Sequence, residues 1–322
     1  MTGAAILEHS PWRVIGDTRD RVGESPVWDE QAQALYWVDI EGRCIRRLDV
    51  ATGAVQSWDT PQRPGCLALT NRGSLMVAME TGIFEVELLD PPQIRTRLVA
   101  AVTHRAPGMR FNDGRCDAQG RFWLGTMVMD MSLALPAGAL YVLDENGLGG
   151  PVVDAMITPN GLAFGVDGRV AYHSDSHPSV QQIWAFDVDP TTGRMSGRRP
   201  WVDMRPLPGR PDGGAVDAAG FYWICANDAG LIHRFAPDGQ LVASLEVPVP
   251  KPAMCAFGGP DLNTLYVTSI QPAGAEPGLS GALFACELNV RGRFEPRFSR
   301  FPTRPDQPAT FSPNPVTPGD KP

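Results

Sequence analysis

Four short stretches that recur at similar intervals constrain the fold of this chain more than any other feature. Each stretch places one oxygen-bearing side chain beside glycine or proline, just ahead of a short apolar segment. The oxygen-bearing residues are Glu24, Asn112, Asn160 and Asp212. Their separations are 88, 48 and 52 residues, and Cys66 divides the longest interval into 42 and 46. A chain that returns to equivalent points at a nearly constant interval is a ring or an array of like units.

Short apolar segments between turn signals predict a protein made almost wholly of β-strands. Glycine and proline, with 34 and 31 residues, punctuate the chain throughout. Segments such as Ala34–Asp39, Phe122–Gly125 and Thr264–Thr268 are rich in aromatic and β-branched residues and are too short for helices. No long stretch has the apolar period of a helix. Residues 116–124 and 216–224 are similar enough to be copies of one internal repeat.

The repeat predicts an all-β fold, a six-bladed β-propeller with four-stranded blades around a central channel. The repeats are expected to start near Glu24, Cys66, Asn112, Asn160, Asp212 and Cys255. Residues 1–303 would form this single domain. A strand near Trp12–Ile15 would pair with the last blade and close the ring, since closure removes exposed edges. The Pro-rich residues 304–322 are expected to form a flexible tail.

Charge and cysteine content argue against several classes of protein. A net charge of −8 disfavours a nucleic-acid-binding surface and, more weakly, binding to an acidic membrane face. The six cysteines include no CxxC pair, which favours reduced thiols over a disulfide framework. The N-terminus lacks the features of a signal peptide, and no apolar run approaches the ~20 residues of a membrane helix. We therefore expect a soluble, cytoplasmic protein, a monomer or small homo-oligomer, with no nucleic-acid or membrane partner.

In a propeller, the first residues of the innermost strands meet at one mouth of the channel. The four oxygen-bearing residues would converge there as two carboxylates and two carboxamides. Such a set suits a hard divalent cation such as Ca²⁺, Mg²⁺ or Mn²⁺ better than zinc. Neutral amides would leave the cation partly uncompensated and Lewis-acidic. The alternative interpretation is ordinary turn chemistry, because Asn-Gly and Asp-Gly are favoured turn dipeptides without a ligand role.

Other polar residues are weaker candidates. The segment Tyr172–Ser176 contains His, Ser and Asp, but alternate residues of one strand face opposite sides, so they cannot form a triad. Asp175 is expected on the channel side, where it would orient the site, and His173 is expected in the core. Cys66 and Cys255 stand at repeat starts without an oxygen ligand and are interpreted as channel packing.

These stretches carry a resemblance to a known family. The chain resembles the SMP-30/gluconolactonase family, which includes regucalcin and the bacterial sugar-lactone hydrolases. The matching stretches are Gly23–Trp28, Arg110–Gly114, Asn160–Leu162, Pro211–Gly213 with Asp217, and Cys255–Gly259 with Leu265–Thr268. They extend from about residue 20 to about residue 290 in the family's order and spacing. No single tetrapeptide is specific, but the ordered set is.

The resemblance implies a six-bladed propeller with one divalent metal ion at the top of the channel. It implies that Glu24, Asn160 and Asp212 are the metal ligands and that Asp212 is also the general base. Asn112 would lie close to the metal and touch the substrate, and Arg110 would bind substrate oxygens. The reaction would be hydrolysis of a sugar (aldono-) lactone to the free sugar acid. The metal would polarise the lactone carbonyl while Asp212 activates the attacking water.

The resemblance leaves the substrate and the metal open. The family often carries an acidic residue in the loop after Met127, and Asp130 is the candidate for substrate binding there. The metal could be Ca²⁺, Mg²⁺, Mn²⁺, Zn²⁺ or Fe²⁺. Related propellers hydrolyse aryl esters or organophosphates, and a non-catalytic propeller would only bind sugar or calcium. The polar rim of Arg110, Asn112 and Asp130 favours a sugar substrate, and Asp212 favours catalysis over binding alone.

Overall fold

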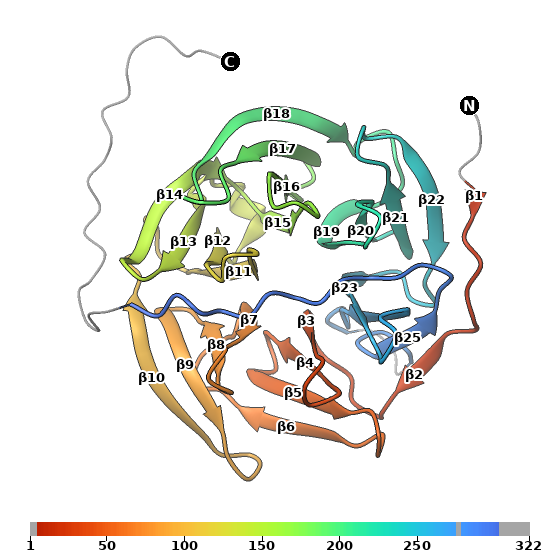
Figure 1. Ribbon diagram of the computed structural model, residues 1–322, viewed down its shortest axis with the longest axis horizontal. Helices are drawn as coiled ribbons and strands as arrows, with labels where there is room; N and C mark the ends of the chain where they lie inside the picture. The colour runs from red at the N-terminus through yellow and green to blue at the C-terminus, as the bar shows by residue number, and fades with distance from the viewer. Residues whose placement is uncertain (1–4, 275–277, 303–322) are drawn as a thin grey trace.

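The computed structural model describes residues 5–274 and 278–302. They form six sheets arranged as blades in a ring around a central channel (Figure 1). The predicted six-bladed β-propeller is therefore confirmed. Within these residues the one helical element is the 3₁₀ segment η1 (Met131–Leu133). No helix in this part of the chain is long and apolar enough to span a membrane.

Each blade is a sheet whose strands are neighbours in chain order, from the innermost strand outward. Blade 1 comprises β3 (Gly23–Asp29), β4 (Ala34–Asp39), β5 (Cys44–Asp49) and β6 (Val55–Asp59), and blade 2 comprises β7 (Cys66–Leu69), β8 (Leu75–Ala78), β9 (Gly82–Leu88) and β10 (Ile94–Ala101). Blade 3 comprises β11 (Met109–Cys116), β12 (Phe122–Val128), β13 (Gly138–Asp144) and β14 (Gly147–Met156). Blade 4 comprises β15 (Pro159–Phe164), β16 (Val170–Asp175), β17 (Gln182–Val188) and β18 (Met195–Asp203).

The last two blades also recruit strands from the N-terminal residues. Blade 5 comprises β19 (Arg210–Val216), β20 (Tyr222–Asn227), β21 (Leu231–Phe235), β22 (Leu241–Glu246) and, at its outer edge, the parallel strand β1 (Ala5–Ile6). Blade 6 comprises β23 (Pro252–Gly258), β24 (Thr264–Ser269), β25 (Leu283–Glu287) and β2 (Arg13–Ile15). The antiparallel pairing of Val14 in β2 with Phe284 in β25 confirms the expected closing strand. Strand β1 was not expected from the sequence.

The core lies between neighbouring blades, where the faces of adjacent sheets pack together. One apolar cluster joins blades 2 and 3 through Cys66 and Phe111, and another joins blades 5 and 6 through Trp223 and Phe257. All eight residues of β11 and all six of β15 are buried, because the innermost strands are covered on both faces. The predicted packing role of Cys66 agrees with its complete burial.

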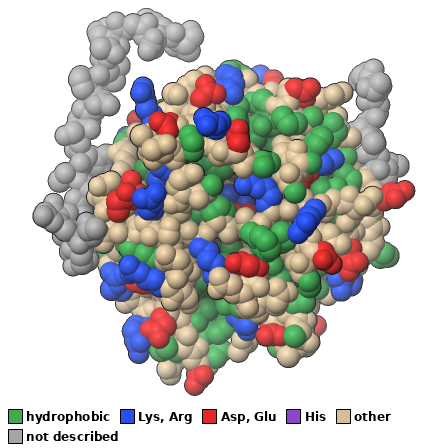
Figure 2. Space-filling model, in the orientation of Figure 1, with side chains coloured by type: hydrophobic (Ala, Val, Ile, Leu, Met, Phe, Trp, Pro, Cys, Tyr) green, Lys and Arg blue, Asp and Glu red, His purple; other side chains and the backbone are tan. Residues whose placement is uncertain are grey.

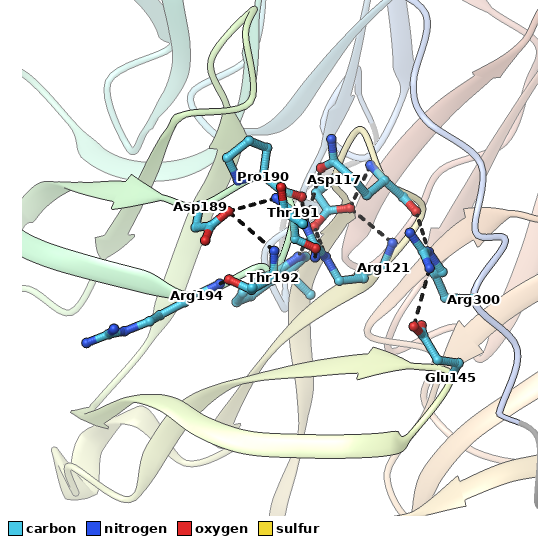
Figure 3. Close-up of polar contacts among 11 residues, drawn as sticks. Asp117, Arg121, Glu145, Asp189, Pro190, Thr191, Thr192, Arg194 and Arg300 are labelled. Carbon is cyan, nitrogen blue, oxygen red and sulfur yellow. Dashed lines mark hydrogen bonds and ion pairs between the residues drawn. The ribbon is translucent and has the colours of Figure 1, made fainter.

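The internal repeat in the sequence forms equivalent turns in blades 3 and 5. In blade 3, Asp117 accepts hydrogen bonds from the indole Nε1 of Trp123 and from Nε of Arg121, at 2.9 and 2.5 Å. Arg121 in turn donates to the carbonyl oxygens of Pro190 and Thr191 in blade 4 (Figure 3). Asp217 of blade 5 holds Trp223 and Arg234 in the same way. These buried networks tie the turns that follow the innermost strands to the rest of the fold.

Residues 288–302, here called the C-terminal strap, cross the ring over one mouth of the channel (Figure 1). In every blade the strap contacts the end of the innermost strand or the turn after it. Its partners in blades 1 to 6 are Asp29, Leu69, Gly120, Phe164, Ala218 and Leu262. Arg115 of β11 also forms a partly buried ion pair with Glu295 of the strap. On this face, acidic and basic side chains are interspersed (Figure 2). The predicted tail, residues 304–322, lies outside the described residues.

Candidate functional site

The candidate site lies at the channel mouth opposite the strap. All innermost strands run in one direction across the ring, since their far ends lead into the turns that the strap contacts. Glu24, Asn112, Asn160 and Asp212 lie in the first half of their strands, at the other mouth. In each of these four strands a β-bulge interrupts the pairing with the next strand at the oxygen-bearing residue or directly after it. Asn112 and Asp212 lie within the bulge, whereas Glu24 and Asn160 are the last regularly paired residues before it. Because a bulge redirects side chains, this shared irregularity shapes the channel mouth at equivalent points of four blades.

Glycines beside these residues allow the innermost strands to approach one another closely. A Cβ atom on Gly213 would lie 2.3 Å from Cγ of Met254, and one on Gly161 would lie 2.5 Å from the Tyr222 hydroxyl. Gly161 also has a φ of +64°, which favours glycine. The Asn-Gly and Asp-Gly pairs are thus required for packing around the channel as well as for the local backbone.

The structure brings Arg110, Asn112 and Asn160 into direct contact. Nδ2 of Asn112 donates to Oδ1 of Asn160 at 2.9 Å and to the carbonyl oxygen of Pro159 at 3.0 Å. Oδ1 of Asn112 accepts from a terminal guanidinium nitrogen of Arg110 at 2.7 Å. Nδ2 of Asn160 donates to Oγ of Ser176 at 2.9 Å. These bonds fix the orientation of both carboxamides at the mouth.

Asp212 and Glu24 are carboxylates without a basic partner within hydrogen-bond distance among the described residues. Burial raises the pKa of Asp212 to about 7, although Arg210 and a 2.7 Å hydrogen bond from Nδ2 of Asn227 oppose this. Burial also raises the pKa of Glu24 well above its usual value, and the negative charges of Asp212 and Asp113 add to the effect. The two carboxylates therefore lie close enough to repel each other.

This arrangement fits a hard divalent cation. Two mutually repelling carboxylates would be stabilised by a cation between them, and the neighbouring carboxamides offer further neutral oxygens. Oδ1 of Asn227 and Oδ1 of Asp113 are also buried without a hydrogen-bond partner in the described part of the chain. Among those residues no group of three or more His, Cys, Asp and Glu side chains has the spacing of a metal site. A cation here therefore depends on amide oxygens as well as on Glu24 and Asp212.

Arg110 lies at the same mouth with donor groups to spare. One terminal nitrogen contacts Asn112 and the carbonyl oxygen of Phe111, whereas the buried Nε has no partner among the described residues. Burial lowers the pKa of Arg110, and the nearby Glu41 and Glu24 partly compensate. A buried guanidinium without a bonded carboxylate is suited to binding the oxygens of a ligand.

Asp130 lies at the rim and not beside the predicted ligands. It is exposed and forms the N-cap of η1, where Oδ1 accepts hydrogen bonds from the backbone N–H and the hydroxyl of Ser132. The same turn touches blade 4 through the carbonyl oxygen of Met131 and the ring of His177, 3.2 Å apart. Asp130 is thus held by its own turn, and its role in substrate binding stays a prediction.

The remaining candidates support the site without joining it. The carboxylate of Asp175 accepts from the backbone N–H groups of Ile157, Thr158 and His177, and it thereby fixes the segment that leads into β15. His173 is fully buried, and burial lowers its pKa to about 3, in keeping with the expected packing role.

Sequence reasoning missed Asn227, whose amide holds Asp212. Nδ2 of Asn227 also donates to the carbonyl oxygen of Pro252 at 3.3 Å. Asn227 ends β20 and pairs across the sheet with Arg210. The only signal in the sequence is its position at the end of a strand that follows the Asp212 motif, which is too general to identify it.

The fold and the site together define a class: a six-bladed propeller with carboxylates and carboxamides gathered at one channel mouth. The model of the SMP-30/Gluconolactonase/LRE-like region matches residues 22–271. The chain therefore belongs to the SMP-30/gluconolactonase family, and the predicted family is confirmed.

Relatives and solved structures agree with this assignment. The chain is 39% identical over 284 residues to a 6-deoxy-6-sulfogluconolactonase of Pseudomonas putida, covering 86% of this chain and 95% of the relative. It is 33% identical over 295 residues to a pentonolactonase of Haloferax volcanii, covering 88% and 96%. A calcium-binding protein, regucalcin, from Agrobacterium tumefaciens superimposes with a TM-score of 0.84 at 27% identity, covering 92% and 99%. The predicted enzyme class, a carboxylic ester hydrolase of the lactonase type, is confirmed by these relatives.

Proposed function

We propose that this protein hydrolyses a sugar (aldono-) lactone to the free sugar acid with the help of one divalent metal ion. The observation that carries the proposal is the convergence of Glu24, Asn112, Asn160 and Asp212 at one mouth, beside the unpaired donors of Arg110. The names of two relatives, a 6-deoxy-6-sulfogluconolactonase and a pentonolactonase, support a sugar lactone as the substrate.

Glu24, Asn160 and Asp212 would hold the metal, with Asn112 beside them. When bound, a divalent cation supplies a Lewis acid that polarises the lactone carbonyl. The calcium-binding relative supports a divalent ion, and its identity among Ca²⁺, Mg²⁺, Mn²⁺, Zn²⁺ and Fe²⁺ is open. The mixture of carboxylate and amide oxygens favours the harder ions of this set.

Asp212 would act as the general base. Its Oδ2 is fixed by Asn227, so the carboxylate has one defined orientation at the mouth. Asp212 would take a proton from the attacking water as that water adds to the lactone carbonyl carbon. Asp212 would return this proton to the ring oxygen as the ring C–O bond breaks, which leaves the free acid and a sugar hydroxyl and regenerates the carboxylate.

Arg110, Asn112 and Asp130 would set the substrate specificity. The free guanidinium N–H groups of Arg110 would donate to ring or hydroxyl oxygens, and its bond to Asn112 would hold it in place. Asp130 would accept from a sugar hydroxyl at the rim. These polar groups favour a sugar over an apolar aryl ester, because an apolar ligand would leave buried donors unpaired.

The proposal is tested by acid release from a panel of aldonolactones, with protein treated with EDTA, protein resupplied with each divalent ion, and Asp212→Asn. We expect release that is lost with EDTA, restored by a metal, and absent in Asp212→Asn. The matched control is Asp203→Asn, which removes an exposed carboxylate paired with Arg205. Spontaneous rates with every lactone and every metal would refute the lactonase proposal. Hydrolysis of aryl esters alone would indicate the alternative hydrolase, and metal binding without turnover would indicate a binding protein.

We also propose a cytoplasmic location. All six cysteines lie in the described residues as free, buried thiols, which is typical of a reducing compartment. Fractionation of the source cells with an antibody to this chain tests the location, and recovery outside the cytoplasm would refute it.

A further inference from the structure

Two basic side chains converge on one carboxylate beside the candidate site. Nε of Arg210 donates to Oδ2 of Asp228 at 2.6 Å, and the ammonium group of Lys251 contacts Oδ1 of the same carboxylate. Burial alone would raise the pKa of Asp228, yet the hydrogen bonds from Lys251 and Arg210 lower it. Asp228 is therefore ionised, and the three side chains, here called the rim cation cluster, keep one net positive charge.

The rim cation cluster is connected to the predicted metal ligands on two sides. A terminal nitrogen of Arg210 donates to the carbonyl oxygen of Ser176 at 3.3 Å, and Oγ of Ser176 accepts from Asn160. Arg210 also precedes Asp212 by two residues on β19. On the other side, Lys251 immediately precedes Pro252, whose carbonyl oxygen accepts from Asn227. The cluster thus lies at the mouth, where a single residue, Ser176, links Arg210 to the predicted ligand Asn160 by hydrogen bonds.

Stability does not explain this arrangement well. Ion pairs that are partly exposed contribute only about 0–1 kcal/mol. Across the same mouth Arg63 is shared by two carboxylates, Glu41 and Glu80, and Glu41 also acts on the nearby guanidinium of Arg110.

The rim cation cluster retains capacity to bind an anion. Two of the five guanidinium N–H groups of Arg210 and one of the three ammonium N–H groups of Lys251 are used in the contacts above. The side chains of Arg210 and Lys251 are 19% and 28% exposed, so their remaining donors can be reached from the mouth. A group with several anionic oxygens would make charge-assisted hydrogen bonds to both residues at once.

We propose that Arg210 and Lys251 form a subsite for an anionic substituent carried by the lactone at the end remote from its carbonyl. The substituent is a sulfonate, a phosphate or a carboxylate, all of which present the same oxygen acceptors. This inference rests on the proposed lactonase function and names the class of lactone.

The test compares kcat/KM for two lactones with the same ring, gluconolactone and 6-phosphogluconolactone, with 6-deoxy-6-sulfogluconolactone as a third arm. The wild-type protein is expected to prefer an anionic lactone by about tenfold or more, as expected for charge-assisted hydrogen bonds. Lys251→Gln and Arg210→Gln are each expected to reduce this preference several-fold, and the double variant is expected to abolish it. Raising the salt from about 0.05 M to about 0.5 M should weaken the preference in the wild type.

The matched control is Arg205→Gln, which removes one basic charge that is paired with Asp203 outside the cluster. It is expected to leave the preference unchanged. A wild-type protein that hydrolyses gluconolactone without preferring either anionic lactone would overturn the subsite and leave the lactonase function standing. A preference that survives both substitutions would also overturn it. Failure to hydrolyse any of the three lactones with any divalent ion would overturn the lactonase function and the subsite with it.

Discussion

At the scale of single residues, the main feature of this protein is Asp212, an acidic residue whose burial makes its charged form unfavourable. Burial raises the pKa of Asp212 to about 7 from an ordinary value of 3.8. In the metal-free protein the folded state therefore holds a proton that the unfolded chain loses. Between these two pKa values this carboxyl makes folding less favourable as the pH rises. Above about pH 7 the cost is constant, on the order of 4 kcal/mol.

Asp212→Asn is accordingly expected to stabilise the metal-free protein, and by more at about pH 8 than at about pH 5. The asparagine keeps the shape of the side chain and has no charge to bury. Urea unfolding at several pH values in EDTA would measure the difference. A difference in the free energy of unfolding that did not vary with pH would contradict the prediction. With a divalent ion present the order should reverse, because the variant loses an anionic ligand.

Asn227→Leu tests how much the orientation of Asp212 matters. The leucine keeps the branched arrangement of heavy atoms but loses the hydrogen bond to Oδ2 of Asp212. Loss of one such bond, worth on the order of 1–2 kcal/mol, is expected to lower kcat about tenfold with a smaller change in KM. Asn263→Leu, in the turn between β23 and β24 on the strap face, is the control. A kcat within twofold of the wild type would show that Asn227 does not position the base.

The sequence predicted most of the residues at the mouth but not the residues that hold them in place. Glu24, Asn112, Asn160 and Asp212 each stand beside Gly or Pro at the repeat period, so the pattern marks them. Asn227 reaches Asp212 across a bulge from the next strand, 15 residues away. No local motif records such a cross-strand contact, because it depends on register and not on neighbouring residues.

At the scale of elements, the strap is the feature that the sequence did not predict. Its residues lack the alternating pattern of a strand, and it forms only isolated bridges, between Leu288 and His9 and between Phe298 and Thr70. Its binding energy comes instead from a few buried side chains. Phe298 is completely buried against Cys66, Phe111 and other residues of blades 2 and 3. Long-range contacts of this kind have no periodic signature that would identify them in advance.

Phe298→Ala is expected to destabilise the protein by about 3–5 kcal/mol, because it leaves a cavity between the strap and the core. Phe294→Ala, on the same strap, removes a ring that is 52% exposed and should change stability by no more than about 0.5 kcal/mol. Denaturant unfolding of the two variants measures the contrast. Equal losses would mean that the strap is held by its backbone and arginines and not by this aromatic anchor. In the absence of denaturant the metal affinity should be unchanged, since the strap lies on the opposite face.

At the scale of the whole molecule, stability depends on closing the ring. Strand β2 covers the edge of β25, whose residues Leu283, Phe284 and Ala285 are at most 1% exposed. Trp12 lies beside this strand, packs against the cluster between blades 5 and 6, and donates to the carbonyl oxygen of Glu246 at 2.7 Å. The N-terminal segment therefore joins two blades as well as closing one of them.

Deletion of residues 1–16 is expected to lower the free energy of unfolding by more than about 2 kcal/mol, since it exposes apolar surface and a strand edge. Deletion of residues 1–8 removes β1 at the outer edge of blade 5 and the partly buried Leu7 but keeps β2 and Trp12, and it is the control, with a much smaller expected effect. Thermal unfolding and light scattering would measure stability and association. Similar behaviour of the two deletions would show that β2 is not needed to close the ring.

The sequence was sufficient to predict the global architecture because each blade repeats one pattern at a nearly fixed interval. The six innermost strands contain the six predicted repeat starts, from Glu24 in β3 to Cys255 in β23. The same pattern could not predict β1, a two-residue strand whose pairing with Ala243 in blade 5 is parallel and distant. Repetition thus specifies the ring, whereas the segments outside the repeat are specified only by tertiary contacts.

Closure by β2 also fixes the order in which the molecule can be completed during translation. Arg13 and Leu283 belong to one sheet but are separated by most of the chain. At about 5–20 residues per second, the ribosome adds Leu283 roughly 15–55 s after Arg13. Throughout that interval the closing strand has no partner, while the first five blades emerge one hairpin at a time. The strand that completes the last blade is thus among the first segments to be made and among the last to be paired.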